Sequence, residues 1–169
     1  TASLDALSMD PYSTNNSFTT AFINNIYEGL ARFNEELKVE PALAESWQTV
    51  SPTVWRFKLR RNVKFHNGRA MTAAHVKRSL ERAVNPATQS PGGGYLSAIA
   101  GYDDLVGGKA TELSGITAPD DATVVIKLSR ADATFLHVMA INFAYVVPKE
   151  AVEAAGADWG KKPVGTGAF

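Results

Sequence analysis

The stretch with the most chemically capable side chains is WRFKLRRNVKFHNGR, residues 55–69. It interleaves seven basic side chains, counting His66, with three aromatic rings, a composition typical of surfaces that bind single-stranded nucleic acids. Within residues 54–60, however, charged and apolar residues alternate, which in a strand places them on opposite faces. The 17 lysines and arginines are balanced by 17 aspartates and glutamates, so the chain has no overall attraction for a polyanion. The stretch therefore indicates a half-buried strand with one basic face, and we expect no nucleic-acid partner.

The other residues that could do chemistry do not form a recognisable catalytic or metal-binding set. His66, His75 and His137 are the only histidines, and no two of them have the four-residue spacing of helical metal ligands. The chain has no cysteine and no G-x-S-x-G sequence, which excludes thiolate chemistry and a nucleophile elbow. Neither PGGGY nor PVGTGAF has the lysine and spacing of a P-loop. We therefore expect a protein that is not an enzyme and that holds no metal or cofactor.

A run of three glycines, at residues 92–94, precedes Tyr95 and could bring the backbone close to a ligand. Glycine permits such an approach because it has no Cβ. The same run is equally well explained as a flexible loop, and the residues alone leave the two interpretations open. The final PVGTGAF raises a related question, because its glycine turn is followed by only two residues.

The composition is that of an ordinary globular protein. Of the 169 residues, 45% are hydrophobic and 20% are charged. This length predicts one domain, or one domain together with parts of another. No run approaches the ~20 apolar residues that a membrane-spanning helix needs.

Helices and short strands must position the residues above, and they do not alternate regularly, so we expect a mixed α/β layer. Ser17 is suited to cap a helix over residues 18–29, and Thr72 is suited to cap a helix over residues 72–84. Strands are predicted at 54–60, near 116 and near 124. Weaker patterns predict extended structure in LARF, LKVE and AYVVP, and helix in ALAESW, ATFLHVMA and KEAVEAAGADWG.

Several segments together resemble one family. MDPYSTNN, NIYEGLARFNEELKVEPALAESW, VWRFKLRRNVKFHNGRAMTAAHVKRSLERA and PVGTGAF occur in the order and spacing of the family 5 solute-binding proteins of ABC importers. The resemblance covers nearly the whole chain. It implies an α/β fold of the periplasmic-binding-protein-like II class, present only in part, because family members are roughly three times this length, well beyond one domain.

The resemblance also implies a function and a location. A family member captures a small solute, here a peptide or peptide-like compound, in a cleft between two lobes, and delivers it to the ABC permease of the inner membrane. We therefore expect a periplasmic protein whose export signal lies outside this chain. The alternative is the solute-sensing domain of a cytoplasmic transcription regulator with the same fold. Dipeptides, longer peptides, glutathione, opines, sugars and nickel chelates all occur as solutes among relatives, and the resemblance does not choose among them.

The family pattern predicts how the chain is divided. Residues 1–33 would be the N-terminal part of lobe I, residues 34–162 a second domain, and residues 163–169 the return into lobe I. The chain would then be an N-terminal fragment without the lobe that closes over the ligand. We expect such a fragment to self-associate, because the helix at 18–29 would expose apolar side chains.

Three short segments are expected to contact the solute by analogy with relatives. The family context favours contact for the glycine run, and it places an acidic residue near Asn15 in some relatives, where asparagine supplies no negative charge. The predicted ligand-binding residues are Thr14, Asn15, Asn16 and Ser17 in the first segment, Gly92, Gly93, Gly94 and Tyr95 in the second, and Thr166 and Gly167 in the third.

Overall fold

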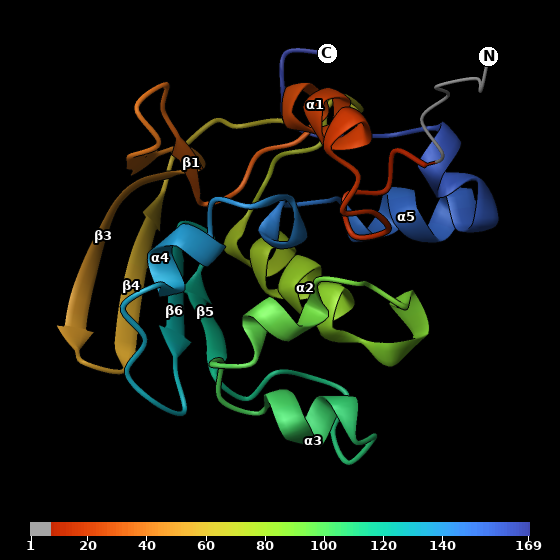
Figure 1. Ribbon diagram of the computed structural model, residues 1–169. Coiled ribbons are helices and arrows are strands. Elements are labelled where there is room, and N and C mark those ends of the chain that lie inside the picture. Colours follow the sequence, from red (N-terminus) through yellow and green to blue (C-terminus); the bar gives the residue numbers. More distant parts are fainter. Residues whose placement is uncertain (1–7) are drawn as a thin grey trace.

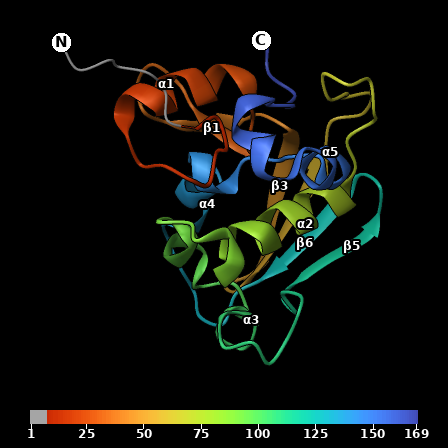
Figure 2. The ribbon, with the colours of Figure 1, turned by 90° about the vertical axis from the view of Figure 1, so that its right-hand side faces the viewer.

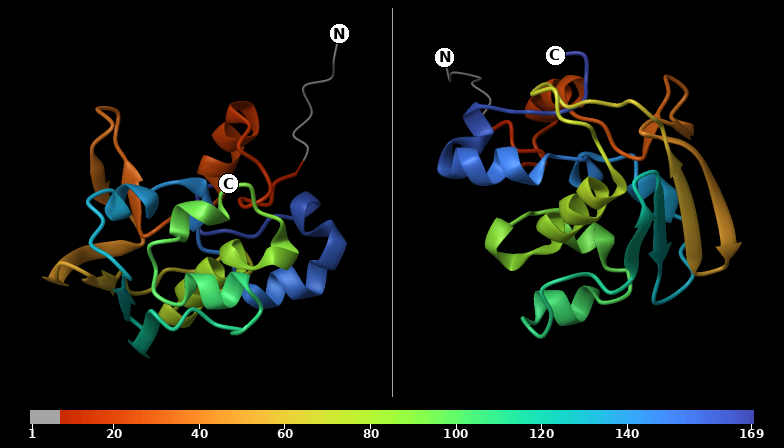
Figure 3. Two further views of the ribbon diagram at one scale, coloured as in Figure 1. Left: turned by 60° about the horizontal axis from the view of Figure 1, so that its bottom comes forward. Right: turned by 180° about the vertical axis from the view of Figure 1, so that it is seen from behind.

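The structure, a computed structural model, describes residues 8–169 and is built on a four-stranded antiparallel sheet with the strand order β3-β4-β6-β5 (Figure 1). The strands are β3 (Ala44–Ser51), β4 (Val54–Leu59), β5 (Ile116–Asp120) and β6 (Thr123–Lys127). The helices lie on one side of this sheet. Figure 3 shows that no helix of the described residues covers the other face.

β4 shows why the sequence folds into this sheet. Phe57 and Leu59 are buried on the side that faces the helices, whereas Arg56 and Lys58 are exposed on the other side, as the two-residue period of a strand requires. The ring of Phe57 packs against that of Phe135, with the centroids 6.4 Å apart. The strand predicted here is confirmed, and the aromatic residue at its centre belongs to the core.

The segment ALAESW is not the short helix predicted from its sequence. Its second half begins β3, in which Trp47 lies opposite Phe57 and Gln48 lies opposite Arg56. Alanine, leucine and glutamate favour helices, but this preference is weak, and pairing with a neighbouring strand overrides it.

The segment AYVVP is extended from Tyr145 onward, after Ala144 ends a short 3-10 helix, and it belongs to neither sheet. The amide of Val146 donates to the carbonyl of Glu28 at 2.9 Å. The amide of Val147 donates to Oγ of Ser79 at 2.9 Å. These bonds satisfy a buried backbone without a strand partner, and they attach the segment to the N-terminal part of the chain and to the helix at residues 73–84.

That helix is α2 (Ala73–Val84), and its bounds match the prediction closely. Val76, Leu80 and Val84 are buried on one face, and the helix contacts β5 and β6. Thr72 is the N-cap residue, and its amide donates to Nδ1 of His75 at 3.1 Å. The helix ends before Asn85-Pro86, as expected.

We predict that His75 makes this protein less stable in acid. Burial lowers the pKa of His75, and the nearby Glu150 carboxylate opposes this effect. Because the folded-state pKa lies below the unfolded value of 6.5, the unfolded chain binds the proton first, and stability is lost as the pH falls from 6.5 through the folded pKa. Urea unfolding between pH 5 and pH 8 should therefore show a weaker pH dependence for His75→Gln, which keeps an acceptor for the Thr72 amide. His137→Gln, a change at an exposed histidine, is the control, and an unchanged slope in His75→Gln would contradict the prediction.

α1 (Ser17–Ile26) is shorter than predicted, and its N-cap is Asn16, so the prediction of Ser17 as the cap is wrong. Oδ1 of Asn16 accepts bonds from the amides of Phe18 at 3.0 Å and Thr19 at 3.1 Å, which satisfies two free amides of the first turn. The helix ends at Ile26 because Tyr27 turns away in an extended conformation and buries its ring in the core.

The remaining elements connect these parts. A two-stranded ribbon, β1 (Ala31–Phe33) and β2 (Val39–Pro41), confirms the extended LARF segment and the second half of LKVE, whereas Leu37 has a left-handed φ of 60° in the turn between the strands. The other helices are α3 (Tyr102–Val106), α4 (Phe135–Val138) and α5 (Lys149–Ala155), with short 3-10 helices η1 (Pro86–Thr88), η2 (Gly93–Leu96), η3 (Asn142–Ala144) and η4 (Gly156–Lys161). Within residues 8–169, no helix is long and apolar enough to cross a membrane.

The N-terminal and C-terminal segments pack into the same core as the sheet. Tyr12, Ile23 and Leu30 are almost fully buried in it. The C-terminal segment lies beside α1 at one end of the molecule (Figures 1 and 2), where the amide of Gly167 donates to the carbonyl of Ile26 at 2.9 Å.

An ion pair joins the MDP segment to α2. Nη1 and Nη2 of Arg82 donate to the two carboxylate oxygens of Asp10 at 3.0 and 2.5 Å. The Arg82 guanidinium also lies 5.0 Å from the centroid of the Tyr12 ring, and the Tyr12 hydroxyl donates to the carbonyl of Tyr145 at 2.5 Å. Burial raises the pKa of Tyr12 well above its usual value, so this hydroxyl remains a donor.

Candidate functional site

A groove runs along one side of α1, between this helix and the segment at residues 140–145. It consists of two adjoining hollows of about 510 and 320 Å³, which share Thr20, Asn24, Ile141 and Asn142. We call it the α1 groove. Its other lining residues are Asn15, Ser17, Ala21, Tyr95 and Phe143 in the larger hollow, and Arg32, Phe33, Ala140 and Tyr145 in the smaller one.

The larger hollow brings together predicted residues from two distant segments. Asn15 and Ser17 lie on one side of it and Tyr95 on another. Asn16 and Thr14 instead shape the loop, because Asn16 caps α1 and its amide donates to Oγ1 of Thr14 at 3.0 Å. These two residues position Asn15 and Ser17 and do not line the hollow.

The glycine run forms the start of η2 and is packed closely. Gly92 lies against the ring of Phe143 so tightly that a Cβ would overlap it, and a Cβ on Gly93 would lie 2.9 Å from the carbonyl oxygen of Ala83. Only Gly94 faces open space. The run therefore carries Tyr95, a residue that is 60% exposed and whose ring stacks on that of Phe143 with the centroids 5.9 Å apart.

The third predicted segment lies at the opposite end of α1. Thr166 donates to Oε2 of Glu28 at 2.8 Å. Gly165 makes two hydrogen bonds with His66: the His66 amide donates to the Gly165 carbonyl at 2.9 Å, and the Gly165 amide donates to the side-chain Nδ1 of His66 at 3.2 Å. Gly167 lines a further hollow of about 230 Å³, which adjoins the smaller hollow of the α1 groove at Asn24, Arg32 and Tyr145. Neither Thr166 nor Gly167 lines the larger hollow, which contains Tyr95.

Asn24 and Asn142 are groove residues that the sequence analysis missed. Asn24 follows Thr20 by one helical turn, so the helical period of residues 18–29 was a signal that could have placed both on one face. Asn142 lies in an apolar segment far away in sequence, and nothing in the pattern linked it to α1.

The larger hollow offers hydrogen bonds and apolar contacts rather than acid–base chemistry. Among residues 8–169, its lining contains amides, hydroxyls and apolar groups, and no carboxylate, lysine, arginine or histidine. Nearby, Tyr145 donates its hydroxyl to Oδ1 of Asn24 at 2.8 Å. Burial, with a smaller contribution from the Glu28 carboxylate, raises the pKa of Tyr145 to about 12, so this donor keeps its proton at neutral pH.

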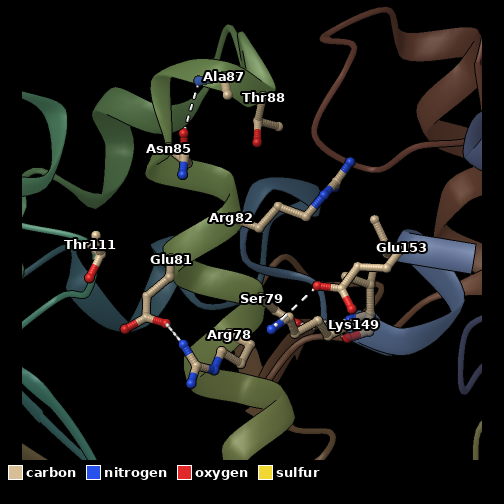
Figure 4. Close-up of a pocket in the computed structure, with 12 residues that line it drawn as sticks. Arg78, Ser79, Glu81, Arg82, Asn85, Ala87, Thr88, Thr111, Lys149 and Glu153 are labelled. Atoms are coloured by element: carbon tan, nitrogen blue, oxygen red, sulfur yellow. Dashed lines mark hydrogen bonds and ion pairs between the residues drawn. The ribbon is translucent and has the colours of Figure 1, made fainter. Parts of the chain in front are cut away.

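A further hollow, away from the α1 groove, has a volume of about 440 Å³. It lies between α2 and α5 and is lined by many charged side chains (Figure 4). Its cations already have partners: Arg82 binds Asp10, and Lys149 lies 3.3 Å from Glu153. Figure 4 shows Arg78 turned toward Glu81, at 3.5 Å. Because these charges neutralise one another, this hollow is a weaker candidate than the α1 groove, in which amide groups remain available.

We found no candidate metal centre in the described part of the chain. Within residues 8–169, no three histidine, aspartate or glutamate side chains are close enough together to hold a metal ion.

Comparisons with known proteins point to one family. The model of the bacterial extracellular solute-binding proteins, family 5 Middle, matches residues 38–169. The periplasmic oligopeptide-binding protein OppA of Salmonella typhimurium is 35% identical over 156 residues, which are 90% of this chain and 28% of that protein. The periplasmic murein peptide-binding protein MppA of Escherichia coli is 32% identical over 168 residues, or 96% of this chain and 31% of MppA.

A solved structure shows the same fold. The Haemophilus influenzae OppA complex with RPPGFSPFR superimposes with a TM-score of 0.89 at 30% identity, over 96% of this chain and 33% of the OppA chain. The chain thus spans about a third of the length of the relatives it matches, and it has part of the α/β fold of periplasmic binding proteins.

Proposed function

Since this chain belongs to the bacterial extracellular solute-binding proteins of family 5, we propose that the whole protein is the substrate-binding component of an ABC importer. It captures a peptide or peptide-like solute in the periplasm and presents it to a membrane permease. This chain supplies one wall of the binding cleft, and the proposed division remains residues 1–33 and 163–169 in lobe I, with residues 34–162 as the second domain.

The observation that carries this proposal is the α1 groove. Asn15 and Ser17 meet there with Tyr95, which follows the glycine run and is far away in sequence. Its larger hollow offers amides, hydroxyls and an exposed tyrosine ring, which suit a solute rich in peptide groups. The names of two relatives, which specify oligopeptides and murein peptides, agree with this choice.

The mechanism is binding without covalent chemistry. A solute that contacts both walls of a cleft stabilises the closed arrangement by its extra affinity for that arrangement. Asn15, Ser17 and Tyr95 would supply contacts on the near wall. We propose that neither a metal nor an organic cofactor takes part.

Calorimetry on the full-length protein tests this function. We expect an alanine peptide of three to five residues to bind with one-to-one stoichiometry, and we expect native mass spectrometry to detect peptides that co-purify. Failure of all peptides to bind, together with a helix-turn-helix sequence upstream of this chain, would favour the sensing domain of a transcription regulator instead.

We also propose that the 169-residue chain on its own self-associates through α1. Phe18 and Phe22 are 43% and 46% exposed and stack edge to face at 5.1 Å, so they form an apolar patch open to solvent. Light scattering should show a mass above that of one chain, and replacing both phenylalanines with serine should reduce it. Leu37→Ser, at an exposed residue of the β1–β2 turn, is the control and should leave the mass unchanged.

A further inference from the structure

We infer that Asn24 and Asn142 together recognise an uncharged amide group of the solute. This inference rests on the proposed function and adds to it the chemical class of group that the α1 groove accepts. Both asparagines line both hollows of the groove, and each has one half of its side-chain amide without a partner.

Asn142 supplies a fixed acceptor. Only the nitrogen half of its side-chain amide is hydrogen-bonded: Nδ2 donates to the carbonyl of Pro11 at 2.6 Å and to that of Thr14 at 3.2 Å. The residue is 8% exposed, and within residues 8–169 no donor reaches Oδ1. The oxygen borders the groove and is not enclosed, because it is not one of the fully buried polar atoms that lack a partner, so a solute N–H could replace the water that hydrates it.

Asn24 supplies a donor. Its Oδ1 accepts the bond from the Tyr145 hydroxyl at 2.8 Å, and this bond sets the orientation of the amide. Nδ2 then has no acceptor among the described residues and is free to face the groove. Because Asn24 also borders the 230 Å³ hollow beyond Tyr145, it lies at the centre of the hollows along α1.

A donor on α1 and an acceptor on the facing segment match the two polar groups of a peptide unit, which point in opposite directions. The solute carbonyl would accept from Nδ2 of Asn24, and a solute N–H would donate to Oδ1 of Asn142. A charged group is poorly suited to the larger hollow, because it would lose hydration without meeting an opposite charge. The flanking Ile141, Phe143 and Tyr95 side chains would instead cover apolar parts of the solute.

The first experiment changes the protein. In the full-length protein, calorimetry with tri-, tetra- and penta-alanine should show that Asn24→Leu weakens binding about tenfold, the effect of one lost hydrogen bond that leaves a solute carbonyl unpaired. Asn25→Leu is the matched control, because Asn25 is the next residue of the same helix, is exposed, and does not line the α1 groove. We expect it to change the dissociation constant less than twofold.

The second experiment changes the solute and leaves the protein intact. Replacing each peptide bond of the tightest alanine peptide with an ester in turn removes one N–H donor at a time. We expect one ester to weaken binding about tenfold in the wild-type protein and distinctly less in Asn24→Leu, because both changes remove contacts to the same amide.

The outcomes separate this inference from the proposed function. If no alanine peptide binds the wild-type protein, the peptide-binding function fails, and the inference fails with it. If the peptides bind and Asn24→Leu weakens binding no more than Asn25→Leu does, the function stands and the paired-amide inference is overturned.

Discussion

Replacing Arg82 with alanine should lower the free energy of unfolding by about 2–4 kcal/mol. The substitution leaves the Asp10 carboxylate without its bidentate partner and removes the guanidinium from the face of Tyr12. Breaking a buried pair costs about 3–5 kcal/mol, and the expected loss is smaller because the two side chains remain 25% and 14% exposed. Urea unfolding followed by circular dichroism measures the change.

Two further variants make the result interpretable. Arg82→Lys keeps the charge but cannot make the bidentate contact with Asp10. Its free energy of unfolding should therefore lie between those of the wild-type protein and Arg82→Ala. Arg56→Ala removes an arginine from the exposed face of β4 and should change stability by less than about 0.5 kcal/mol. A loss in Arg82→Ala as small as that of Arg56→Ala would show that the MDP segment is held to α2 by other contacts.

Replacing Gly165 with alanine should cost about 3 kcal/mol, the upper range for forcing extra atoms into a packed site. Gly165 is buried, and a Cβ there would overlap the carbonyl of Ile26 and press on the ring of Tyr27. The oxygen belongs to the backbone at the end of α1, so it cannot move aside as a flexible side chain would. The displaced segment would also weaken its bonds to His66.

Gly94→Ala is the matched control for this prediction. No atom lies within 4 Å of a Cβ built there, and the same chemical change should be neutral or stabilise the fold by about 0.4–1 kcal/mol, because it restricts the unfolded chain. Thermal unfolding of the two variants should therefore give shifts of very different size. Equal shifts in Tm would mean that residues 165–167 pack against the end of α1 loosely enough to accommodate an extra methyl group.

The parts of the fold that were predicted correctly are those specified by local pattern. β4 alternates between apolar and charged residues from Trp55 to Leu59, and α2 has an apolar face and a threonine cap. β3 was missed because its local preference is helical and only its pairing with β4 makes it a strand. The cap of α1 was placed one residue late, since Asn16 and Ser17 are both good caps and only the backbone geometry chooses between them.

The groove was predicted in part for a similar reason. Asn15, Ser17 and Tyr95 came from the family pattern, which locates segments but not the side chains that face each other. Asn142 reaches the groove because it binds the carbonyls of Pro11 and Thr14, contacts between residues far apart in sequence. No periodicity encodes such a contact, so only the folded chain reveals it.

Tyr95 stacks on Phe143, and Phe143 packs against Gly92. This arrangement assigns the stability of the loop and the contact with a solute to different residues. The parts that hold the loop are buried, whereas the ring that would meet a solute is exposed. If Tyr95 contacts the solute as proposed, substitutions there would change selectivity with little effect on folding, whereas a larger residue at Gly92 would overlap Phe143. Such a surface could acquire affinity for new solutes through successive single substitutions, each of which leaves the protein folded.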